Sequence, residues 1–356
     1  MILSALTRAV AAIAIAAAII AAILLALGAS PIGVFVALAQ GAFGTWYACT
    51  DTLVRATPLI FTGLAISVSF SGALWNIGAD GQLVAGAMVA GAIGPCLSAW
   101  PHLIALLIMM LAGAAGGAIW GGICGWLRAR RDTNEVISTI MMNFVAAQLL
   151  SWGVHGPLME ASGAYPTSTA IAESARLHMF LPPTRLNWGI AIAVVLAFAC
   201  YLLLFKTSIG FQVRAMGLNR RSATFFGIPI ARLTIGILAL SGALAGIGGA
   251  VQVSAITHRL YEKMSPGWGF EGIAVALVAR LNPIGIIAAA LLFGALDNGS
   301  QAMQRAQGVS AELVSVIQAL VIMILLAFDA PVFVRLRSAL QRDSVAKPIA
   351  VETGDA

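Results

Sequence analysis

The eight residues NIGADGQL lie between two long apolar runs and contain three polar side chains, those of Asn76, Asp80 and Gln82. Polar side chains at membrane depth are costly unless they face a cavity or a partner, and glycine-broken helices are where transporters expose backbone groups to a solute. The same residue types form turns, so a turn at the membrane surface is the alternative. The segment lacks Lys and Arg, which a cytoplasmic turn would often carry. We therefore favour a functional break that contacts a polar solute.

Asn143 is the second candidate, because it lies inside an apolar run that begins at TNEV. Hydrogen bonding between helices and contact with a solute explain a buried amide equally well. Glu135, at the start of the same run, needs no solute. An N-cap at Thr133 and the favourable interaction of an acidic side chain with the helix dipole account for it.

A short apolar segment begins at GWGFEG, which contains Trp268, Phe270 and Glu271. An ionisable side chain in a membrane segment is by default a candidate for function. The alternative is that the Glu271 carboxylate reaches toward the outer interface. We place all three residues on the expected solute pathway.

The chain carries none of the usual signatures of hydrolytic catalysis. A phosphate-binding loop needs Gly before Lys and then Ser or Thr, but Lys206 follows Phe205. There is no HExxH, no G-x-S-x-G and no CxxC, and the four cysteines are scattered in or near apolar segments. We expect no catalytic site, no metal site and no cofactor in this chain.

The composition indicates that these residues lie in or between membrane helices. Of 356 residues, 60% are hydrophobic and 10% are charged, against about 25% charged in soluble domains, and the mean hydropathy is +0.95. Apolar runs of about 20 residues cross a bilayer as helices. We predict an all-α polytopic membrane protein with about ten transmembrane helices. The predicted spans are 9–28, 53–75, a third that follows NIGADGQL and ends near residue 99, 102–127, 136–154, 187–205, 233–253, 268–279, 284–296 and 313–328.

The distribution of basic residues predicts the orientation. With the N-terminus in the cytoplasm, 14 of the 20 Lys and Arg residues fall on the cytoplasmic side. This bias agrees with the positive-inside rule. Both termini are therefore expected to be cytoplasmic. The polar connection 155–186 and a polar loop at 297–310 are expected on the opposite side.

The longest polar segment, residues 206–232, is strongly basic and contains no acidic residue. Its centre, 212–226, has helical character, with an interruption expected at Gly217 and an end at Gly227. A surface helix between two membrane spans indicates that another protein binds it. We assign residues 1–334 to one transmembrane domain that includes this loop, and residues 335–356 to a polar cytoplasmic tail expected to be disordered.

Five ordered blocks resemble one known family. They are LWNIGADGQL, TNEVISTIMMNFVA, RAMGLNRRSATFFGI, LSGALAGIGGA and GWGFEGIAVALVARLNPIGIIAAALLFGAL. Together they resemble the permease subunits of bacterial ABC importers for simple sugars and nucleosides, the ribose-type permeases, in particular the branch that works with a basic-membrane-protein-type lipoprotein. The blocks run from about Trp75 to Leu296. Two departures are mild: the family usually has Phe at position 75 and Glu at position 80.

The resemblance implies a subunit that translocates nucleosides or simple sugars across the bacterial inner membrane. It also implies the partners: a cytoplasmic ATPase that binds ATP, a second permease subunit of the same or a different kind, and an extracytoplasmic substrate-binding protein. The substrate is small, neutral and polar, and no nucleic acid is involved. In such permeases a cytoplasmic loop docks into the ATPase. The matching positions here, with Arg220 from the same basic segment, are Arg214, Gly217, Asn219, Arg220, Ala223 and Gly227.

Two alternatives remain. The first is the sister branch for branched-chain amino acids, which has the same mechanism and a different cargo. The second is a secondary transporter coupled to an ion gradient. Such a transporter would more often need acidic or His residues in mid-span, and the chain has few.

Overall fold

The computed structural model describes residues 30–308 and, outside that range, residues 18, 21, 22, 25, 316 and 319. Residues 33–311 form one compact unit, and residues 1–32 with 312–356 form another. The predicted spans 9–28 and 313–328 lie almost entirely outside the described residues. The predicted disordered tail lies wholly outside them.

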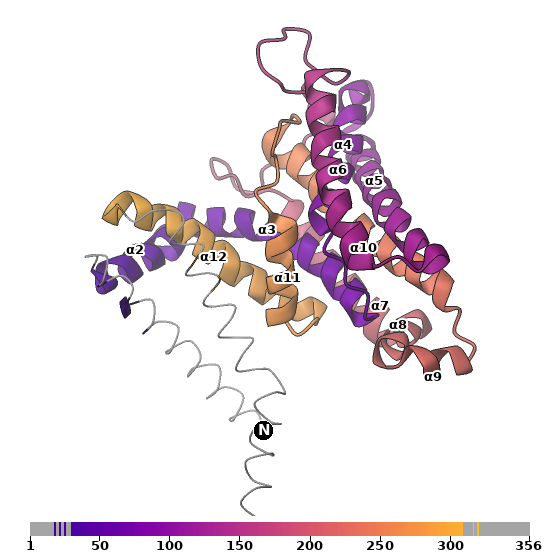
Figure 1. The fold of residues 1–356 in the computed structure, drawn as a ribbon. Helices are drawn as coiled ribbons and strands as arrows, with labels where there is room; N and C mark the ends of the chain where they lie inside the picture. The colour runs from indigo at the N-terminus through magenta and orange to yellow at the C-terminus, as the bar shows by residue number, and fades with distance from the viewer. Residues whose placement is uncertain are drawn as a thin grey trace, which may run out of the picture. The chain divides into compact units, whose positions relative to one another are not determined.

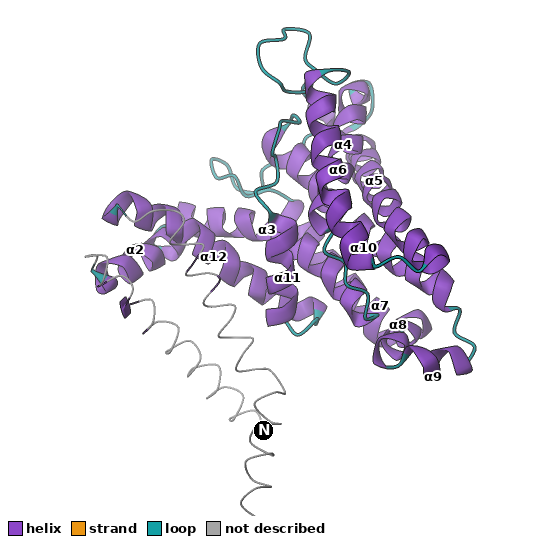
Figure 2. Cartoon of the chain, viewed as in Figure 1, coloured by secondary structure: helices purple, strands orange, loops and turns teal. Residues whose placement is uncertain are grey.

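The described chain consists of helices and their connections (Figures 1 and 2). Within it, β-structure is limited to isolated bridges such as Met159–Ser168. The α-helices are α2 (Pro31–Phe43), α3 (Trp46–Ser71), α4 (Ala79–Ile93), α5 (His102–Arg131), α6 (Glu135–His155), α7 (Gly189–Lys206), α8 (Ser208–Leu218), α9 (Arg220–Phe225), α10 (Ile230–Gln252), α11 (Trp268–Val278) and α12 (Pro283–Gln307).

Seven helices in the described residues are long and apolar enough to cross a membrane. They cover Trp46–Ser71, Ala79–Leu97, His102–Arg131, Glu135–His155, Gly189–Lys206, Ile230–Thr257 and Pro283–Ala306. The predicted span 268–279 corresponds to α11, which has only 11 residues. A helix of that length is about half of what a bilayer needs.

α3 is the central helix of this unit. Its residues from Ala56 to Ser69 are all buried, and it packs against α7, α10, α11 and α12. The prediction of a polar loop at 297–310 is wrong for residues 297–307, because α12 continues to Gln307. The physical reason is that α3 supplies partners for its polar groups. Asn298 Nδ2 donates to the Ala48 carbonyl at 2.9 Å. Residues 309 and 310 lie outside the described residues.

Glycines bring α5 and α10 into backbone contact. A Cβ at Gly117 would overlap the carbonyl oxygen of Gly242, and a Cβ at Gly242 would overlap that of Gly117. Gly113 and Gly121 on α5 likewise face backbone atoms of α10. Small residues at such spacing let helices associate closely where lipid provides no hydrophobic drive.

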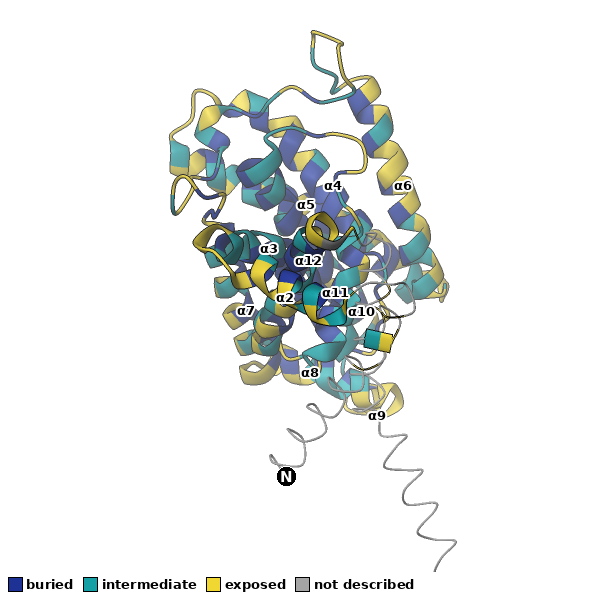
Figure 3. Cartoon of the chain, turned by 90° about the vertical axis from the view of Figure 1, so that its left-hand side faces the viewer, coloured by how far each residue is buried: buried dark blue, intermediate teal, exposed yellow. Residues whose placement is uncertain are grey.

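The basic segment 206–232 contains two short helices, α8 and α9, as its helical character predicted. The interruption is at Asn219 rather than at Gly217, which lies inside α8. Asn219 ends α8 and caps α9, because its side-chain oxygen accepts from the Ser222 N–H at 3.1 Å. In both views, α8 and α9 lie at the opposite end of the unit from the long connection between α6 and α7 (Figures 1 and 3).

Candidate functional site

The predicted break at NIGADGQL is present between α3 and α4. α3 ends at Ser71, α4 begins at Ala79, and the intervening residues are not helical. Asn76 and Gln82 are buried, with 0% and 1% of their surfaces exposed. Both side chains are therefore enclosed by protein. A functional break that contacts a solute stays a prediction, as does its alternative, a turn at the membrane surface.

Asn76 forms four hydrogen bonds in this break. Its Nδ2 donates to Gln82 Oε1 at 2.9 Å and to Ser241 Oγ at 2.8 Å. Its Oδ1 accepts from the Gly78 N–H at 2.9 Å and from Gln82 Nε2 at 3.2 Å. Ser241, on α10, in turn donates to the Ala65 carbonyl of α3 at 2.6 Å. One amide thus ties three helices together at the point where the backbone is interrupted.

Asn143 supports the same break from α6. Its Oδ1 accepts from the Gly81 N–H at 2.8 Å, and its Nδ2 donates to the Ile77 carbonyl at 2.9 Å. Thr139 Oγ1 accepts from the Ile77 N–H at 3.2 Å. Backbone groups away from helical pairing are costly in an apolar environment unless they find partners. Hydrogen bonding between helices therefore accounts for Asn143, and its contact with a solute stays a prediction.

Asp80 connects the first turns of α4 and α11. It lies in the first turn of α4, and its Oδ1 accepts from Ser265 Oγ at 2.6 Å and from the Gly269 N–H of α11 at 3.0 Å. A carboxylate at the N-terminus of a helix is favoured by the helix dipole. Any Cβ at position 269 would overlap the backbone of Asp80, so glycine is required for this approach.

Asp80→Leu is expected to destabilise the protein by about 2–6 kcal/mol, since it leaves a hydroxyl and an N–H without their acceptor at about 1–3 kcal/mol each. Asp80→Glu keeps an acceptor of the kind that the resembling family carries and should retain uptake. Thermal unfolding of the two purified variants in detergent measures the difference. Equal stability of the Leu and Glu variants would contradict the structural role of this carboxylate.

The start of α11 also holds the remaining predicted pathway residues. The Trp268 carbonyl accepts from Thr62 Oγ1 at 3.0 Å, which fixes α11 against α3. Phe270 has 49% of its surface exposed. Within the described residues, the Glu271 side chain has no hydrogen bond or ion pair. In the part of the chain that the structure describes, the side chains of Trp268, Phe270 and Glu271 thus keep free contact groups, and the second oxygen of Asp80 does so too.

Sequence reasoning missed an ion-pair network between α3 and α12. Arg55 Nη1 lies 2.6 Å from Asp297 Oδ2, and Arg55 Nε lies 3.1 Å from Asp51 Oδ2. The i,i+4 spacing of Asp51 and Arg55 would predict their ion pair, because residues four apart are neighbours on a helix. The pairing with Asp297, 242 residues away, has no local signal.

The helices α8 and α9 present an apolar and basic surface. Leu218, Phe225 and Phe226 are 89%, 93% and 86% exposed, and Figure 3 draws much of α9 as exposed. Arg220 and Arg221 are exposed beside them. Exposed apolar residues rimmed by charge are typical of a protein interaction site. We define this set of five residues as the α8–α9 surface.

The predicted coupling residues divide into supporting and exposed positions. Ala223 is buried, and the Arg214 guanidinium lies 5.1 Å from the centre of the Phe205 ring. Gly227 has φ of +74°, a conformation that favours glycine. A Cβ at Gly217 would overlap the Ser71 carbonyl oxygen, so α8 lies directly against the end of α3.

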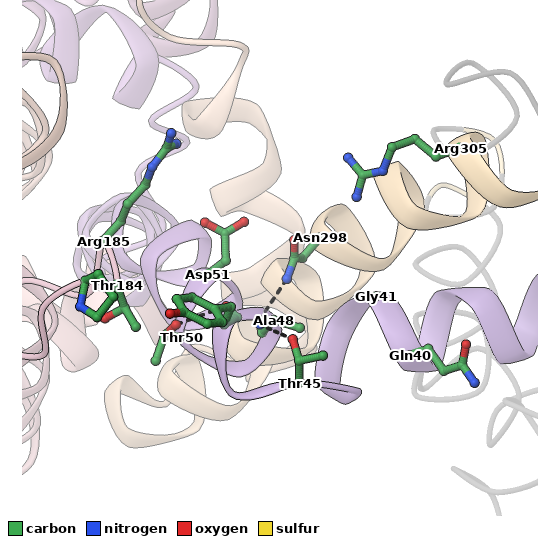
Figure 4. A pocket seen from close by; sticks show the side chains of 12 residues that line it. Gln40, Gly41, Thr45, Ala48, Thr50, Asp51, Thr184, Arg185, Asn298 and Arg305 are labelled. Carbon is green, nitrogen blue, oxygen red and sulfur yellow. Dashed lines mark hydrogen bonds between the residues drawn. The ribbon is translucent and has the colours of Figure 1, made fainter.

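A polar cavity of about 440 Å³ lies at the other end of α3 (Figure 4). It is lined by residues of α2, α3, α12 and the connection that precedes α7. Sequence reasoning did not anticipate this cavity.

Comparison with known proteins gives a family match and several relatives. The family described as "Branched-chain amino acid transport system / permease component" matches residues 48–326. A glucose ABC transporter permease protein of Haloferax volcanii is 32% identical, over 94% of this chain and 90% of its own length. A guanosine ABC transporter permease protein of Bacillus subtilis is 32% identical, over 85% and 87%. A nucleoside ABC transporter permease protein of Lactococcus lactis is 33% identical, over 84% and 85%.

Proposed function

The chain belongs to the family of branched-chain amino acid transport system permease components, and from that membership we propose that it is the permease subunit of an ABC importer for nucleosides or simple sugars. The observation that carries the proposal is the similarity, over at least 84% of the chain, to permeases named for glucose, guanosine and nucleosides. Those names favour nucleosides or simple sugars as the cargo, although the family description names branched-chain amino acids.

The protein is a multi-pass membrane protein, with seven helices among the described residues that are long and apolar enough to cross a membrane. We further propose about ten spans in all, both termini in the cytoplasm, and location in a bacterial inner membrane. The bias of basic residues toward one side supports this orientation. So does the position of α8 and α9, opposite the connection between α6 and α7 (Figure 1).

We propose that the ATPase is a separate cytoplasmic subunit that binds the α8–α9 surface and holds the ATP. The exposed Phe225 and Phe226 provide apolar anchors of the kind that dominate interfaces, and the flanking arginines orient the partner. A second permease subunit and an extracytoplasmic substrate-binding protein complete the assembly. This chain itself is a transport subunit and not an enzyme.

The mechanism follows from the packing of α8 on α3. When the ATPase subunits close on ATP, the docked α8 moves as a rigid element. Because Gly217 lies against the Ser71 carbonyl, the displacement reaches the end of α3. α3 packs against α10, α11 and α12, so its motion changes the position of the interrupted helices. The solute pathway is thereby opened to one side at a time.

We propose that the pathway passes the start of α11, where Phe270 and Glu271 keep free contact groups. A carboxylate accepts hydrogen bonds from solute hydroxyl or N–H groups, and an aromatic side chain packs against a sugar ring or a base. Asn76, Gln82 and Asn143 hold the break in place beside this point. A small neutral polar substrate fits a region with few fixed charges.

Reconstituted uptake tests the proposal. The chain is placed in proteoliposomes with its ATPase, its partner permease and its binding protein, and uptake of labelled guanosine, glucose and leucine is measured. We expect uptake of a nucleoside or a sugar that requires ATP and persists when ion gradients are collapsed. Uptake of leucine alone would assign the cargo to branched-chain amino acids. Uptake by this chain without ATP, lost with the ion gradient, would make it a secondary transporter.

A further inference from the structure

The cavity at the start of α3 has a wall whose own polar groups are hydrogen bonded. Thr45 Oγ1 accepts from the Ala48 N–H at 3.1 Å and so caps α3. Asn298, on α12, donates to the Ala48 carbonyl and to Thr52 Oγ1 at 3.1 Å. Because these bonds fix α12 to the first two turns of α3, the cavity is a preformed feature of this unit.

Several groups on the rim keep free hydrogen-bonding capacity. Within the described residues, the side chains of Gln40, Tyr47, Arg185 and Arg305 have no hydrogen bond or ion pair, although all four line the cavity. In the view of Figure 4, Arg185 and Arg305 come from opposite sides, with Asp51 between them. One oxygen of Asp51 binds Arg55, which leaves the other free to accept.

These groups define the chemistry of a ligand. Each guanidinium offers five N–H donors in a fixed fork, the Gln40 amide offers two donors and an acceptor, and Asp51 offers an acceptor. Tyr47, with 59% of its surface exposed, offers a ring face for a base or a sugar ring. A ligand rich in hydroxyl and ring oxygens satisfies this combination. A volume of about 440 Å³ lies within the range of about 300–1,000 Å³ typical of small-molecule sites.

The position of the cavity fits a role at the side where solute arrives. It lies at the N-terminal end of α3, whereas the α8–α9 surface lies at the C-terminal end of the same helix. Part of its wall belongs to the connection between α6 and α7, the segment expected outside the cytoplasm.

We propose that this cavity is an outer subsite, which holds a neutral polyhydroxylated solute of nucleoside or sugar size before it moves to the start of α11. The proposal rests on the proposed function and adds a second binding position to it. Arg185 and Arg305 bind the solute oxygens, Asp51 accepts from a hydroxyl, and Tyr47 packs against the ring.

Direct occupancy is tested by cysteine protection. Gln40→Cys is introduced after the four native cysteines are replaced by alanine, and the purified permease–ATPase complex is labelled with a small thiol reagent without binding protein. We expect guanosine, adenosine, glucose or ribose to slow labelling at least about threefold, and inorganic phosphate to leave it unchanged. This readout does not require uptake, so it is independent of whether ATP-driven transport occurs. Protection by phosphate alone, or by no solute, would overturn the subsite.

Transport kinetics test the arginines. Losing one hydrogen bond costs about 0.5–1.5 kcal/mol, so Arg185→Gln and Arg305→Gln are each expected to raise KM about fivefold with an unchanged maximal rate. Lys263→Gln, at an exposed position outside the cavity, is the matched control and should leave KM unchanged. An unchanged KM in both arginine variants would contradict the proposal. The proposal would also be contradicted if the variants bound the loaded binding protein more weakly and no solute slowed the labelling of Gln40→Cys.

Discussion

Replacing Gly217 with leucine is expected to abolish ATP-driven uptake while the amount of chain in the membrane stays unchanged. A Cβ at this position would already overlap the Ser71 carbonyl oxygen, and its next neighbours are the Ser71 carbonyl carbon and the Ala73 backbone nitrogen. Backbone atoms cannot move aside as a flexible side chain can. α8 must therefore shift away from the end of α3, and the contact that carries the motion of the ATPase is lost.

The matched control is Gly236→Leu, because nothing in the structure lies within 4 Å of a Cβ at Gly236 on α10. Uptake into cells and membrane content by immunoblot are measured for both variants. We expect an uptake loss of about 100-fold or more for Gly217→Leu, on the order of 3 kcal/mol of lost coupling, and wild-type uptake for Gly236→Leu. Normal transport by Gly217→Leu would remove α8 from the coupling role.

Replacing Gly117 with alanine is expected to destabilise the whole unit by about 3 kcal/mol or more. The added Cβ would overlap the Gly242 carbonyl oxygen at the contact between α5 and α10, and overpacking of this kind costs about 1–3 kcal/mol even where side chains can adjust. Here the contact is between two backbones. The helices can only separate, which opens the packing around α4 as well.

Gly122→Ala provides the comparison on the same helix. A Cβ there meets only the Ala239 side chain at 3.7 Å, an ordinary contact, so the higher helix propensity of alanine should give a small gain of about 0.5–1 kcal/mol. The difference in stability is measured by heating both variants in detergent and monitoring their unfolding by size-exclusion chromatography. Similar unfolding temperatures would show that the α5–α10 contact does not require backbone approach.

Several features of this protein were predictable because they are encoded locally. Long apolar runs predict membrane helices. The break at Asn76 also has a local signal, since polar and glycine residues interrupt two apolar runs. The helical character of the basic segment 206–232 was predicted too, although the interruption is set by the cap at Asn219 and not by Gly217.

Other features depend on residues that are distant in the sequence. The polar stretch from Asp297 looked like a loop, and it is helical because Arg55, Ala48 and Thr52 on α3 satisfy its side chains. Sequence alone left two readings of Asn143, and only its partners on α4 and in the break identify a supporting role. The cavity at the start of α3 combines side chains from α2, α3, α12 and the α6–α7 connection, so no window of sequence predicts it.

The most direct test of the central claim is to purify the tagged chain from its own host in mild detergent and identify the proteins that accompany it. We expect a stoichiometric ATPase that survives washing and is lost when Phe225 and Phe226 are replaced by serine. The Gly236→Leu variant should retain it. A chain that purifies without an ATPase, yet moves solute into vesicles in the absence of ATP, would contradict the importer function.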